Sequence, residues 1–301
     1  MKRILITGAN GFTGRYLAAQ MRQAGYEVHG LVHQPVAGGV PDVATLHVAD
    51  LADAAGLAAV MRAVQPYKVA HLAAIAFVAH GDVDAIYRTN VMGTRNLLEA
   101  LVHSKAPVEA VLLASSANVY GNSVGGVLDE LTAAAPANDY AVSKLAMEYV
   151  ARLYAERLPI VIARPFNYTG VGQSDSFLIP KIVSHVRRLA PVIELGNLEV
   201  ARDFSDVRTV VSCYQRLLES GAAVGQTFNV CSGTAWTLND VLNMAREISG
   251  HPFEVRVNPA FVRHNEVKLL VGNGAKLESV IGKVPPVALR DTLKWMLESD
   301  V

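Results

Sequence analysis

The sequence is poor in cysteine, balanced in charge and free of long hydrophobic runs. It has two cysteines in 301 residues, Cys213 and Cys231, which are too few for a disulfide framework and have no metal-ligand spacing around them. We expect both to be small buried side chains in a reducing cytoplasm, with no bound metal. Lys plus Arg and Asp plus Glu each total 27, so no long-range field favours nucleic acid or an anionic membrane.

The N-terminal apolar run ends at Thr7 and Gly8, so it is too brief for a signal peptide or a membrane span. A chain of this length can fold as one large domain or as a domain with a smaller lobe, and it can bury a sizeable core. We therefore expect a globular cytoplasmic protein that does not enter a membrane.

A glycine-rich loop follows the first predicted strand. Residues 3–7 are a short apolar run typical of a parallel strand buried on both faces, and a helical pattern starts near Arg15. Strand, glycine turn and helix is the order that a dinucleotide pyrophosphate site needs. The sequence therefore predicts cofactor contacts from the loop residues Gly8, Asn10, Gly11, Phe12 and Gly14.

The end of the second predicted strand bears on the choice of cofactor. Residues 27–32 lead to His33, at the place where an NAD enzyme usually carries an Asp or Glu for the adenosine ribose. A carboxylate there would repel a 2′-phosphate, so its absence, with Arg15 and His33 nearby, favours NADP(H) over NAD(H). The alternative for Arg15 is a solvated side chain.

Two further strands add candidate cofactor contacts. The third, residues 44–51, ends at Asp50 and Leu51, and Asp50 could accept the adenine amino group or cap the next helix. The fourth, residues 68–74, has small residues such as Ala73 that let the backbone lie close to the cofactor. His71 in this strand is expected to be a hydrogen-bonded core histidine.

The candidate catalytic residues are Ser116, Tyr140 and Lys144. A fifth strand at residues 110–114 delivers Ser116 at its carboxyl end, where open α/β sheets bind ligands. Tyr140 and Lys144 are four residues apart on a predicted helix introduced by Asn138, so they share a face. A lysine cation beside a phenol favours the phenolate and lowers its pKa, although such pairs also occur by chance. The stripe Leu145, Tyr149 and Leu153 is expected to pack this helix onto the protein.

The alternation of strands and helices predicts an α/β fold with a doubly wound parallel (Rossmann) sheet and a smaller C-terminal substrate-binding lobe. Asn90 opens a long helical pattern as a helix-start or helix-packing amide, and residues 159–165 form a sixth strand. The regular alternation stops after Pro165, apart from a returning strand at 227–231. We expect a dinucleotide-binding domain at 1–165 with a return segment at about 203–231, and a lobe at 166–202 and 232–301 with helices at 237–249 and 288–298.

The glycine loop, Ser116 and Tyr140-x-x-x-Lys144 together resemble the extended short-chain dehydrogenase/reductase family, and the match covers nearly the whole chain. The resemblance implies that Ser116 orients the reacting oxygen and Tyr140 donates or accepts its proton. It also implies that Lys144 binds the nicotinamide ribose and lowers the tyrosine pKa. Asn90 is similar to the family's helix asparagine, in a supporting role.

Segments in the second half are similar to GDP-sugar enzymes of this family. Residues 164–170, 172–177 and 202–207 are especially similar to GDP-4-keto-6-deoxy-D-mannose reductase, and 263–267 resembles a pattern in which an arginine grips the diphosphate. Arginines offer forked donors to phosphate, and a carboxylate can accept two hydrogen bonds from a nucleoside. The alternative for each charged residue is a surface ion pair. The implied substrate contacts are Ser116, Asn167, Arg202, Arg263 and Glu266.

Two departures from related enzymes narrow the reaction. Dehydratases of the family carry an Asp-Glu pair directly after the active-site hydroxyl residue, because they need a base and an acid, and here Ala117 and Asn118 take those places. GDP-fucose synthases use a cysteine where Ala117 stands. Both dehydration and epimerisation at C3 and C5 are therefore disfavoured.

The resemblance thus predicts NAD(P)H-dependent reduction of a GDP-linked 4-keto-6-deoxy-hexose, GDP-4-keto-6-deoxy-D-mannose, to GDP-D-rhamnose for surface polysaccharide. Three alternatives stay open: a reductase that forms GDP-6-deoxy-D-talose, a nucleotide-sugar 4-epimerase whose serine motif is close to residues 116–121, and a non-catalytic cofactor-sensing module. The apolar stripes at 90–101 and 140–153 resemble the paired helices of the family's homodimer, or are buried within one chain.

Overall fold

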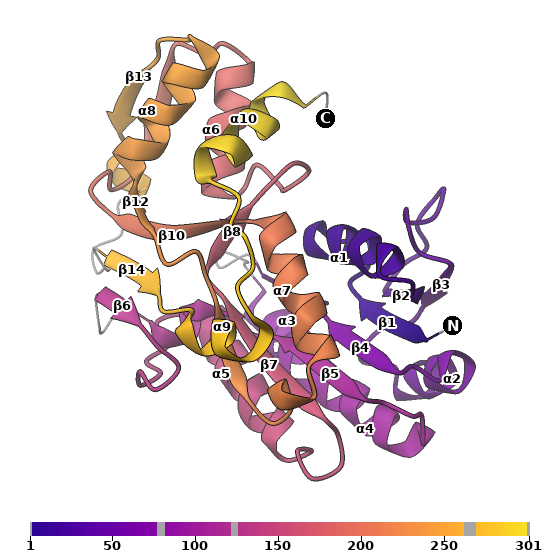
Figure 1. Ribbon diagram of the computed structural model, residues 1–301. Helices are drawn as coiled ribbons and strands as arrows, with labels where there is room; N and C mark the ends of the chain where they lie inside the picture. Colours follow the sequence, from indigo (N-terminus) through magenta and orange to yellow (C-terminus); the bar gives the residue numbers. More distant parts are fainter. Residues whose placement is uncertain (1, 77–81, 122–125, 262–268, 300–301) are drawn as a thin grey trace.

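Seven parallel strands form one large sheet in the computed structural model, which describes residues 2–76, 82–121, 126–261 and 269–299 (Figure 1). From one edge to the other, the strands are β3 (Thr45–Val48), β2 (Glu27–Val32), β1 (Arg3–Thr7), β4 (Lys68–His71), β5 (Ala110–Ala114), β7 (Ile160–Pro165) and β11 (Thr227–Val230). The direction of winding reverses between β1 and β4, and parallel sheets bind ligands at the carboxyl ends around such a point.

Helices cover both faces of this sheet, so the predicted doubly wound α/β architecture is confirmed (Figure 1). One face packs against α1 (Phe12–Gln23), α7 (Val207–Glu219) and α9 (Ala275–Ile281). The other packs against α2 (Ala54–Val64), α4 (Thr94–Ser104) and α5 (Asp139–Arg152). The short helix α3 (Val83–Tyr87) and a π-helical turn, Arg88–Gly93, lead into α4.

The first strand shows why its sequence is apolar without alternation. Ile4, Leu5 and Ile6 are all fully buried. Ile4 and Ile6 belong to the core beneath α1 and α7, whereas Leu5 belongs to the core beneath α2 and α4. A strand with a helix layer on each face needs apolar side chains at every position, which is the pattern that identified it.

A smaller lobe has its own sheets and core (Figure 1). Its larger sheet runs β12 (Ala235–Thr237), β10 (Ala201–Asp206), β14 (Leu269–Gly272) and β6 (Gly126–Leu128), with β8 (Asn167–Thr169) beside β10. Strands β9 (Val192–Leu195) and β13 (Glu254–Val257) form a separate pair. The helices α6 (Leu178–Arg187), α8 (Leu238–Ser249) and α10 (Leu289–Glu298) pack around one apolar cluster.

Two short elements do not follow the predicted division of the chain, which stays a prediction. Strand β6 pairs with β14 of the smaller lobe although it lies within residues 1–165. Helix α9 contacts β11, and Leu277 belongs to the core of the large sheet, although the helix lies within residues 232–301. The predicted helix cap at Thr237 is present as a capping box with Asp240.

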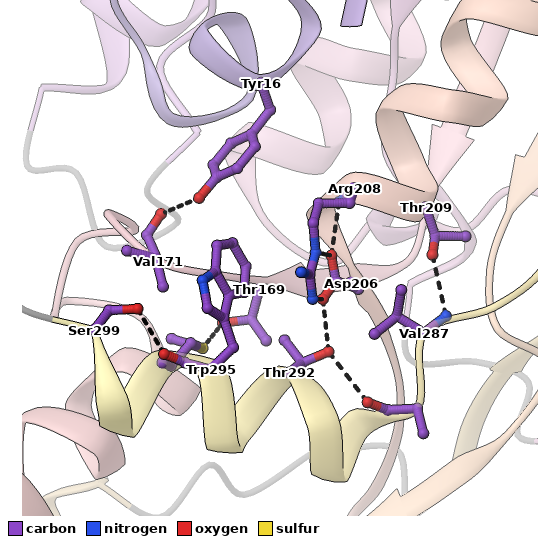
Figure 2. A network of polar contacts seen from close by, with 12 residues as sticks. Tyr16, Thr169, Val171, Asp206, Arg208, Thr209, Val287, Thr292, Trp295 and Ser299 are labelled. Carbon is purple, nitrogen blue, oxygen red and sulfur yellow. Dashed lines mark hydrogen bonds and ion pairs between the residues drawn. The ribbon is translucent and has the colours of Figure 1, made fainter. Parts of the chain in front are cut away.

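The C-terminal helix α10 joins the lobe to the large domain (Figure 2). Thr292 Oγ1 donates to Asp206 Oδ2 over 2.7 Å, and Asp206 also caps α7 and pairs with Arg208. The Arg208 guanidinium lies 4.0 Å from the centre of the Trp295 ring. Tyr16 on α1 packs edge-on against Trp295 with ring centroids 6.1 Å apart. Helix α10 is therefore held against α1 and the start of α7.

One predicted packing face of α5 is wrong. The sequence predicts that Tyr149 and Leu153 pack the helix onto the protein, but they are 57% and 73% exposed. The buried face instead carries Tyr140, Ala141, Ser143, Lys144, Met147, Glu148 and Ala151. Among the described residues, none of the helices is long and apolar enough to span a membrane.

Candidate active site

Strand β5 and helix α5 bring Ser116, Tyr140 and Lys144 together. Ser116 follows β5 and starts the 3-10 turn Ala117–Tyr120, and Tyr140 lies in the first turn of α5. That turn is fixed because Asn138 Oδ1 accepts a hydrogen bond from the Ala141 N–H over 2.9 Å. Tyr140 is hydrogen-bonded to Ser116, and Lys144 Nζ lies 6.0 Å from the centre of the Tyr140 ring.

The environment of Tyr140 keeps its phenol neutral. Burial raises the pKa of Tyr140 to about 12, and the hydrogen bond with Ser116 acts in the opposite direction. The predicted lowering of this pKa by Lys144 stays a prediction, and burial of the phenol outweighs the hydrogen bond with Ser116. A phenol with this pKa is protonated at neutral pH, as a proton donor must be.

Lys144 is also buried, and its ammonium is held by the backbone. Its Nζ donates to the carbonyl of Ala114, the last residue of β5, over 2.7 Å. Burial lowers the pKa of Lys144 to about 8, while the charge of Glu148 raises it. Lys144 thus keeps its cation near neutral pH at a cost in desolvation.

The glycine loop has the form that a pyrophosphate needs. A Cβ on Gly14 would lie 2.2 Å from the Gly8 carbonyl oxygen, and one on Gly8 would lie 2.9 Å from the Ala73 nitrogen, so strand, loop and helix pack too closely for side chains. The α1 N-cap Gly11 offers no side-chain cap, and the first turn has no acidic residue. The first N–H groups of α1 therefore fit an anionic group, and the loop fits a dinucleotide.

The other predicted cofactor residues are brought to the same end of the sheet. Ala73 N–H donates to Thr7 Oγ1 over 3.1 Å beside the loop. Asp50 is exposed next to the buried Leu51, after β3. The alternative role of Asp50 as a helix cap is wrong, because Asp53 caps α2 by accepting from Gly56 N–H over 3.0 Å.

Arg15 and His33 are both exposed, Arg15 on the first turns of α1 and His33 directly after β2. Neither forms an ion pair or a side-chain hydrogen bond with any other residue that the structure describes. Asn10 lies in the glycine loop and Phe12 is the first residue of α1, and both are partly buried.

Asn90 is a buried packing amide and does not start a helix. It lies inside the π-helical turn, not at the start of the helix that the sequence predicts there. Its Nδ2 donates to Ser143 Oγ over 3.0 Å, and its Oδ1 accepts from Ile75 N–H over 2.9 Å. Asn90 therefore ties α5 to the segment after β4.

His71 is a hydrogen-bonded core histidine, as predicted. Its ring nitrogens contact the hydroxyls of Thr7 and Thr94 at 2.7 and 2.9 Å, and burial lowers its pKa to about 3. The two cysteines are free, Cys213 buried and Cys231 partly buried, and burial raises the pKa of both thiols. The described residues contain no group of three or more His, Cys, Asp or Glu side chains that could hold a metal ion.

The predicted substrate residues are placed only in part. Asn167 on β8 and Arg202 on β10 lie on paired strands, and Asn167 Nδ2 donates to the Asp203 carbonyl over 3.3 Å. Strand β8 directly follows β7 of the large sheet, and β10 leads from the lobe into α7 (Figure 1). Arg263 and Glu266 lie outside the described residues.

Four side chains near the site, which the sequence analysis gave no role in it, form two contacts. Glu148, one turn after Lys144, forms a buried ion pair with Arg164. The Tyr168 and Thr13 hydroxyls lie 2.8 Å apart, and the Tyr168 ring stacks on Phe12 with centroids 6.1 Å apart. The spacing of four between Lys144 and Glu148 was a signal, since it places a carboxylate on the buried face of α5.

Comparison with known proteins agrees with this architecture. A family model described as GDP-mannose 4,6 dehydratase matches residues 5–296. GDP-6-deoxy-D-talose 4-dehydrogenase of Aggregatibacter actinomycetemcomitans is 33% identical over 93% of this chain and 91% of its own length. GDP-6-deoxy-D-mannose reductase of Pseudomonas aeruginosa is 33% identical over 98% of this chain and 96% of its own.

Solved structures show the same fold. A crystal structure from Burkholderia cenocepacia J2315, provisionally named an epimerase, has a TM-score of 0.93 and 52% identity, covering 99% of this chain and 97% of that one. RMD from Pseudomonas aeruginosa, complexed with NADPH, has a TM-score of 0.84 and 30% identity over 99% of this chain and 96% of that one. The chain therefore belongs to the GDP-mannose 4,6-dehydratase-like family of extended short-chain dehydrogenases/reductases, which are NAD(P)-dependent enzymes, as predicted.

Proposed function

We propose that the protein reduces the C4 ketone of a GDP-linked 4-keto-6-deoxy-hexose, namely GDP-4-keto-6-deoxy-D-mannose. The observation that carries this proposal is the convergence of Ser116, Tyr140 and Lys144, with Ala117 and Asn118 directly after Ser116. Neither an alanine nor an asparagine can act as the acid or base of a dehydration. The site therefore keeps the groups for proton transfer at C4 and lacks those that family dehydratases use for elimination.

The nicotinamide, when bound, supplies the hydride. The side chains of this protein supply the proton and stabilise charge on the ketone oxygen. Tyr140 is neutral and buried, so its phenol can donate a proton to an oxygen that becomes negative. Ser116 adds a second donor at the same place. Donors aimed at a developing oxyanion bind the transition state more strongly than the ketone, which lowers the barrier.

We propose NADPH as the preferred cofactor. Arg15 is exposed on the first turns of α1, and His33 is exposed directly after β2, near the position from which this fold contacts the adenosine ribose. Their side chains make no ion pair within the described part of the chain. Both could therefore donate hydrogen bonds to a 2′-phosphate, and neither would repel it as a carboxylate would. The NADPH complex of the Pseudomonas aeruginosa RMD, at 30% identity, supports this choice.

The proposed product is GDP-D-rhamnose, a precursor of surface polysaccharide. The Pseudomonas aeruginosa relative named GDP-6-deoxy-D-mannose reductase supports it. In the proposed complex, Asn167 and Arg202 face the sugar nucleotide together with Arg263 and Glu266, which lie outside the described residues. Arginine donors fit the diphosphate because their forked geometry matches phosphate oxygens.

Two other reactions have specific support. The relative named GDP-6-deoxy-D-talose 4-dehydrogenase is as similar, at 33% identity, and its product would need only the opposite face of the ketone to meet the cofactor. The structure at 52% identity is provisionally named an epimerase, and a 4-epimerase would use the same Ser116, Tyr140 and Lys144. An epimerase retains its NAD and regenerates it in each cycle, whereas a reductase consumes NADPH.

The test mixes the purified protein with NADPH and GDP-4-keto-6-deoxy-D-mannose and follows nicotinamide absorbance. We expect stoichiometric loss of NADPH, a slower reaction with NADH, and a product whose C4 configuration by NMR is that of GDP-D-rhamnose. Arg15→Ala is expected to weaken NADPH but not NADH, with Arg22→Ala on the same helix as the control. If the protein oxidised neither NADPH nor NADH, the proposed reductase activity would be contradicted. If NMR showed the talo configuration at C4, the product would be GDP-6-deoxy-D-talose and not GDP-D-rhamnose.

A further inference from the structure

A buried ion pair lies directly behind the candidate active site. Arg164 on β7 donates from Nε and from Nη2 to the two carboxylate oxygens of Glu148 on α5, over 2.9 and 2.6 Å. The Glu148 side chain is fully buried and that of Arg164 is 7% exposed. Charges without solvent need such paired hydrogen bonds, and a forked pair also fixes the relative position of the two elements that carry it.

Glu148 of this pair acts on Lys144 from the same helix. Glu148 is one turn after Lys144, and both side chains lie on the buried face of α5. The Lys144 ammonium donates to the Ala114 carbonyl over 2.7 Å, and the Glu148 carboxylate is the charge that favours its protonated form. The ammonium is therefore bonded to the end of β5, and this carboxylate lies on the same buried face of α5, one turn further along.

The pair also holds the turn that carries Ser116. Ser115 Oγ donates to Glu148 Oε1 over 2.5 Å. On the other side, Arg164 Nη1 donates over 3.1 Å to the hydroxyl of Tyr120, the last residue of the Ser116 turn. The residues on both sides of Ser116 are thus anchored to one ion pair.

Contacts continue from Tyr120 to the smaller lobe. Its hydroxyl donates to Asn229 Oδ1 over 2.6 Å, and Asn229 Nδ2 donates to the Leu128 carbonyl on β6 over 3.0 Å. Strand β6 pairs with β14 in the lobe's sheet. The same network therefore connects the Ser116 turn with the sheet of the smaller lobe.

We propose that Glu148 and Arg164 are positioning residues for the reaction, holding the Lys144 ammonium and the Ser116 turn in one fixed arrangement. This inference rests on the proposed role of Ser116, Tyr140 and Lys144. Neither residue of the pair touches the reacting atoms, so they act through Lys144, Ser115 and Tyr120.

Apart from the Glu148–Arg164 ion pair, the titratable groups around Lys144 carry no charge at neutral pH. His71 on β4 is neutral because burial and the Lys144 cation lower its pKa to about 3. Tyr140 on α5 and Tyr120 on the Ser116 turn are neutral because burial raises their pKa values. Arg164 on β7 is paired with Glu148 itself. The charge state of Glu148 is therefore the variable that a substitution can change.

The test measures the titration of Lys144 directly, by NMR of protein labelled at the lysine ε-carbon, with the signal assigned from Lys144→Met. This readout needs neither substrate nor turnover, so it is independent of the proposed reaction. In Glu148→Gln we expect the Lys144 pKa to fall by about 1 unit or more, which at a pH above both values lowers the charged fraction about tenfold. Glu148→Asp, which retains the charge, should recover most of the difference.

A matched control keeps the proposal falsifiable. Asp206→Asn also removes the carboxylate of an ion pair with an arginine, and the Asp206 side chain is fully buried. This pair lies beside α10 (Figure 2) and not beside Lys144. It should leave the Lys144 titration unchanged. If Glu148→Gln does not fold, the double variant Glu148→Gln/Arg164→Met removes both charges and leaves no orphan cation.

The outcomes separate clearly. A lower Lys144 pKa in the Glu148 variants alone, with a reductase whose kcat falls more than its KM changes, supports positioning. An unchanged Lys144 titration, or an equal change in Asp206→Asn, overturns it. If Lys144 shifts as expected and no variant or wild type turns over the GDP-sugar, the positioning pair stands and the proposed substrate fails.

Discussion

At Tyr140, burial and hydrogen bonding act in opposite directions on one proton. Burial raises the pKa to about 12, and the Ser116 hydroxyl favours the ionised form. A phenol this basic releases its proton only to a stronger base, such as the oxygen of a ketone that is receiving a hydride. In this direction of reaction, a high pKa keeps the donor loaded across the whole physiological range.

Removing that proton donor should stop turnover without changing cofactor binding. Tyr140→Phe keeps the ring and its packing, so NADPH affinity measured by fluorescence titration should stay within about twofold of wild type, while kcat falls by roughly 10²–10⁴-fold. Tyr149→Phe on the exposed side of the same helix is the control and should retain wild-type kcat. A Tyr140→Phe enzyme with nearly full activity would show that another group donates the proton.

Lys144 predicts a pH dependence of stability. Its folded-state pKa is about 8, below the value of 10.5 for a lysine in water, so between these pH values the unfolded chain binds the proton and the folded chain does not. Stability therefore rises with pH through this window, and the penalty of roughly 3 kcal/mol for a buried cation is fully present below about pH 8.

Lys144→Met lacks this titration and provides the comparison. The Tm of the Met variant minus that of wild type should be largest below pH 8 and should decrease as the pH rises toward 10.5. Scanning calorimetry of both proteins across pH 7 to 10.5 measures the difference. A constant difference would mean that Lys144 has an unperturbed pKa in the folded protein.

At the scale of single elements, the start of α5 sets the position of Tyr140. The Asn138 cap accepts a hydrogen bond from the Ala141 N–H, and Tyr140 lies between these two residues in the first turn. Loss of a cap typically costs about 1 kcal/mol and frays the first turn of the helix. The turn that frays here is the one that aims the candidate proton donor.

Asn138→Ala and Thr237→Ala form a matched pair of cap variants. Thr237 caps α8, where its side chain accepts from Asp240 N–H over 3.0 Å. Both variants should lose about 1 kcal/mol in urea unfolding. Only Asn138→Ala should also lose kcat, by several-fold. Equal kcat values in the two variants would show that catalysis does not depend on an ordered first turn of α5.

The elements show what a single sequence can and cannot reveal. Strand β1, the glycine loop and the α8 cap were predictable because each depends on neighbours within a few residues. Asp53 replaced Asp50 as the α2 cap because both carboxylates precede the helix and only the backbone path selects one. The Glu148–Arg164 pair was not predicted, since its partners come from α5 and β7 and a charged side chain in a sequence suggests solvent.

The site shows the same limit. The spacing of Tyr140 and Lys144 predicted that they share a face, and they do. Their proton affinities depend on burial, which no spacing reveals, so the spacing alone could not show that burial raises the pKa of Tyr140. The substrate contacts rest on resemblance because the lobe has irregular connections and its strands come from distant parts of the chain.

For the whole molecule, the most informative surface is the uncovered apolar side of α5. Val142, Tyr149 and Leu153 are 37%, 57% and 73% exposed, and Met92 on the neighbouring π-helical turn is 47% exposed. Exposed apolar side chains that gather on adjacent elements are typical of protein interfaces, whereas isolated ones are ordinary. The homodimer predicted from the sequence would cover this side of the molecule.

Leu153→Asp tests the homodimer because it places a charge on the most exposed of these side chains. Burying an unpaired carboxylate in an apolar interface is unfavourable, so the variant should be monomeric in light scattering at concentrations where wild type is dimeric. The control is Leu189→Asp, at a similarly exposed leucine directly after α6 of the smaller lobe. A Leu153→Asp protein with wild-type mass would place the interface elsewhere. A monomer that still reduces substrate would show that the proposed site is complete within one chain.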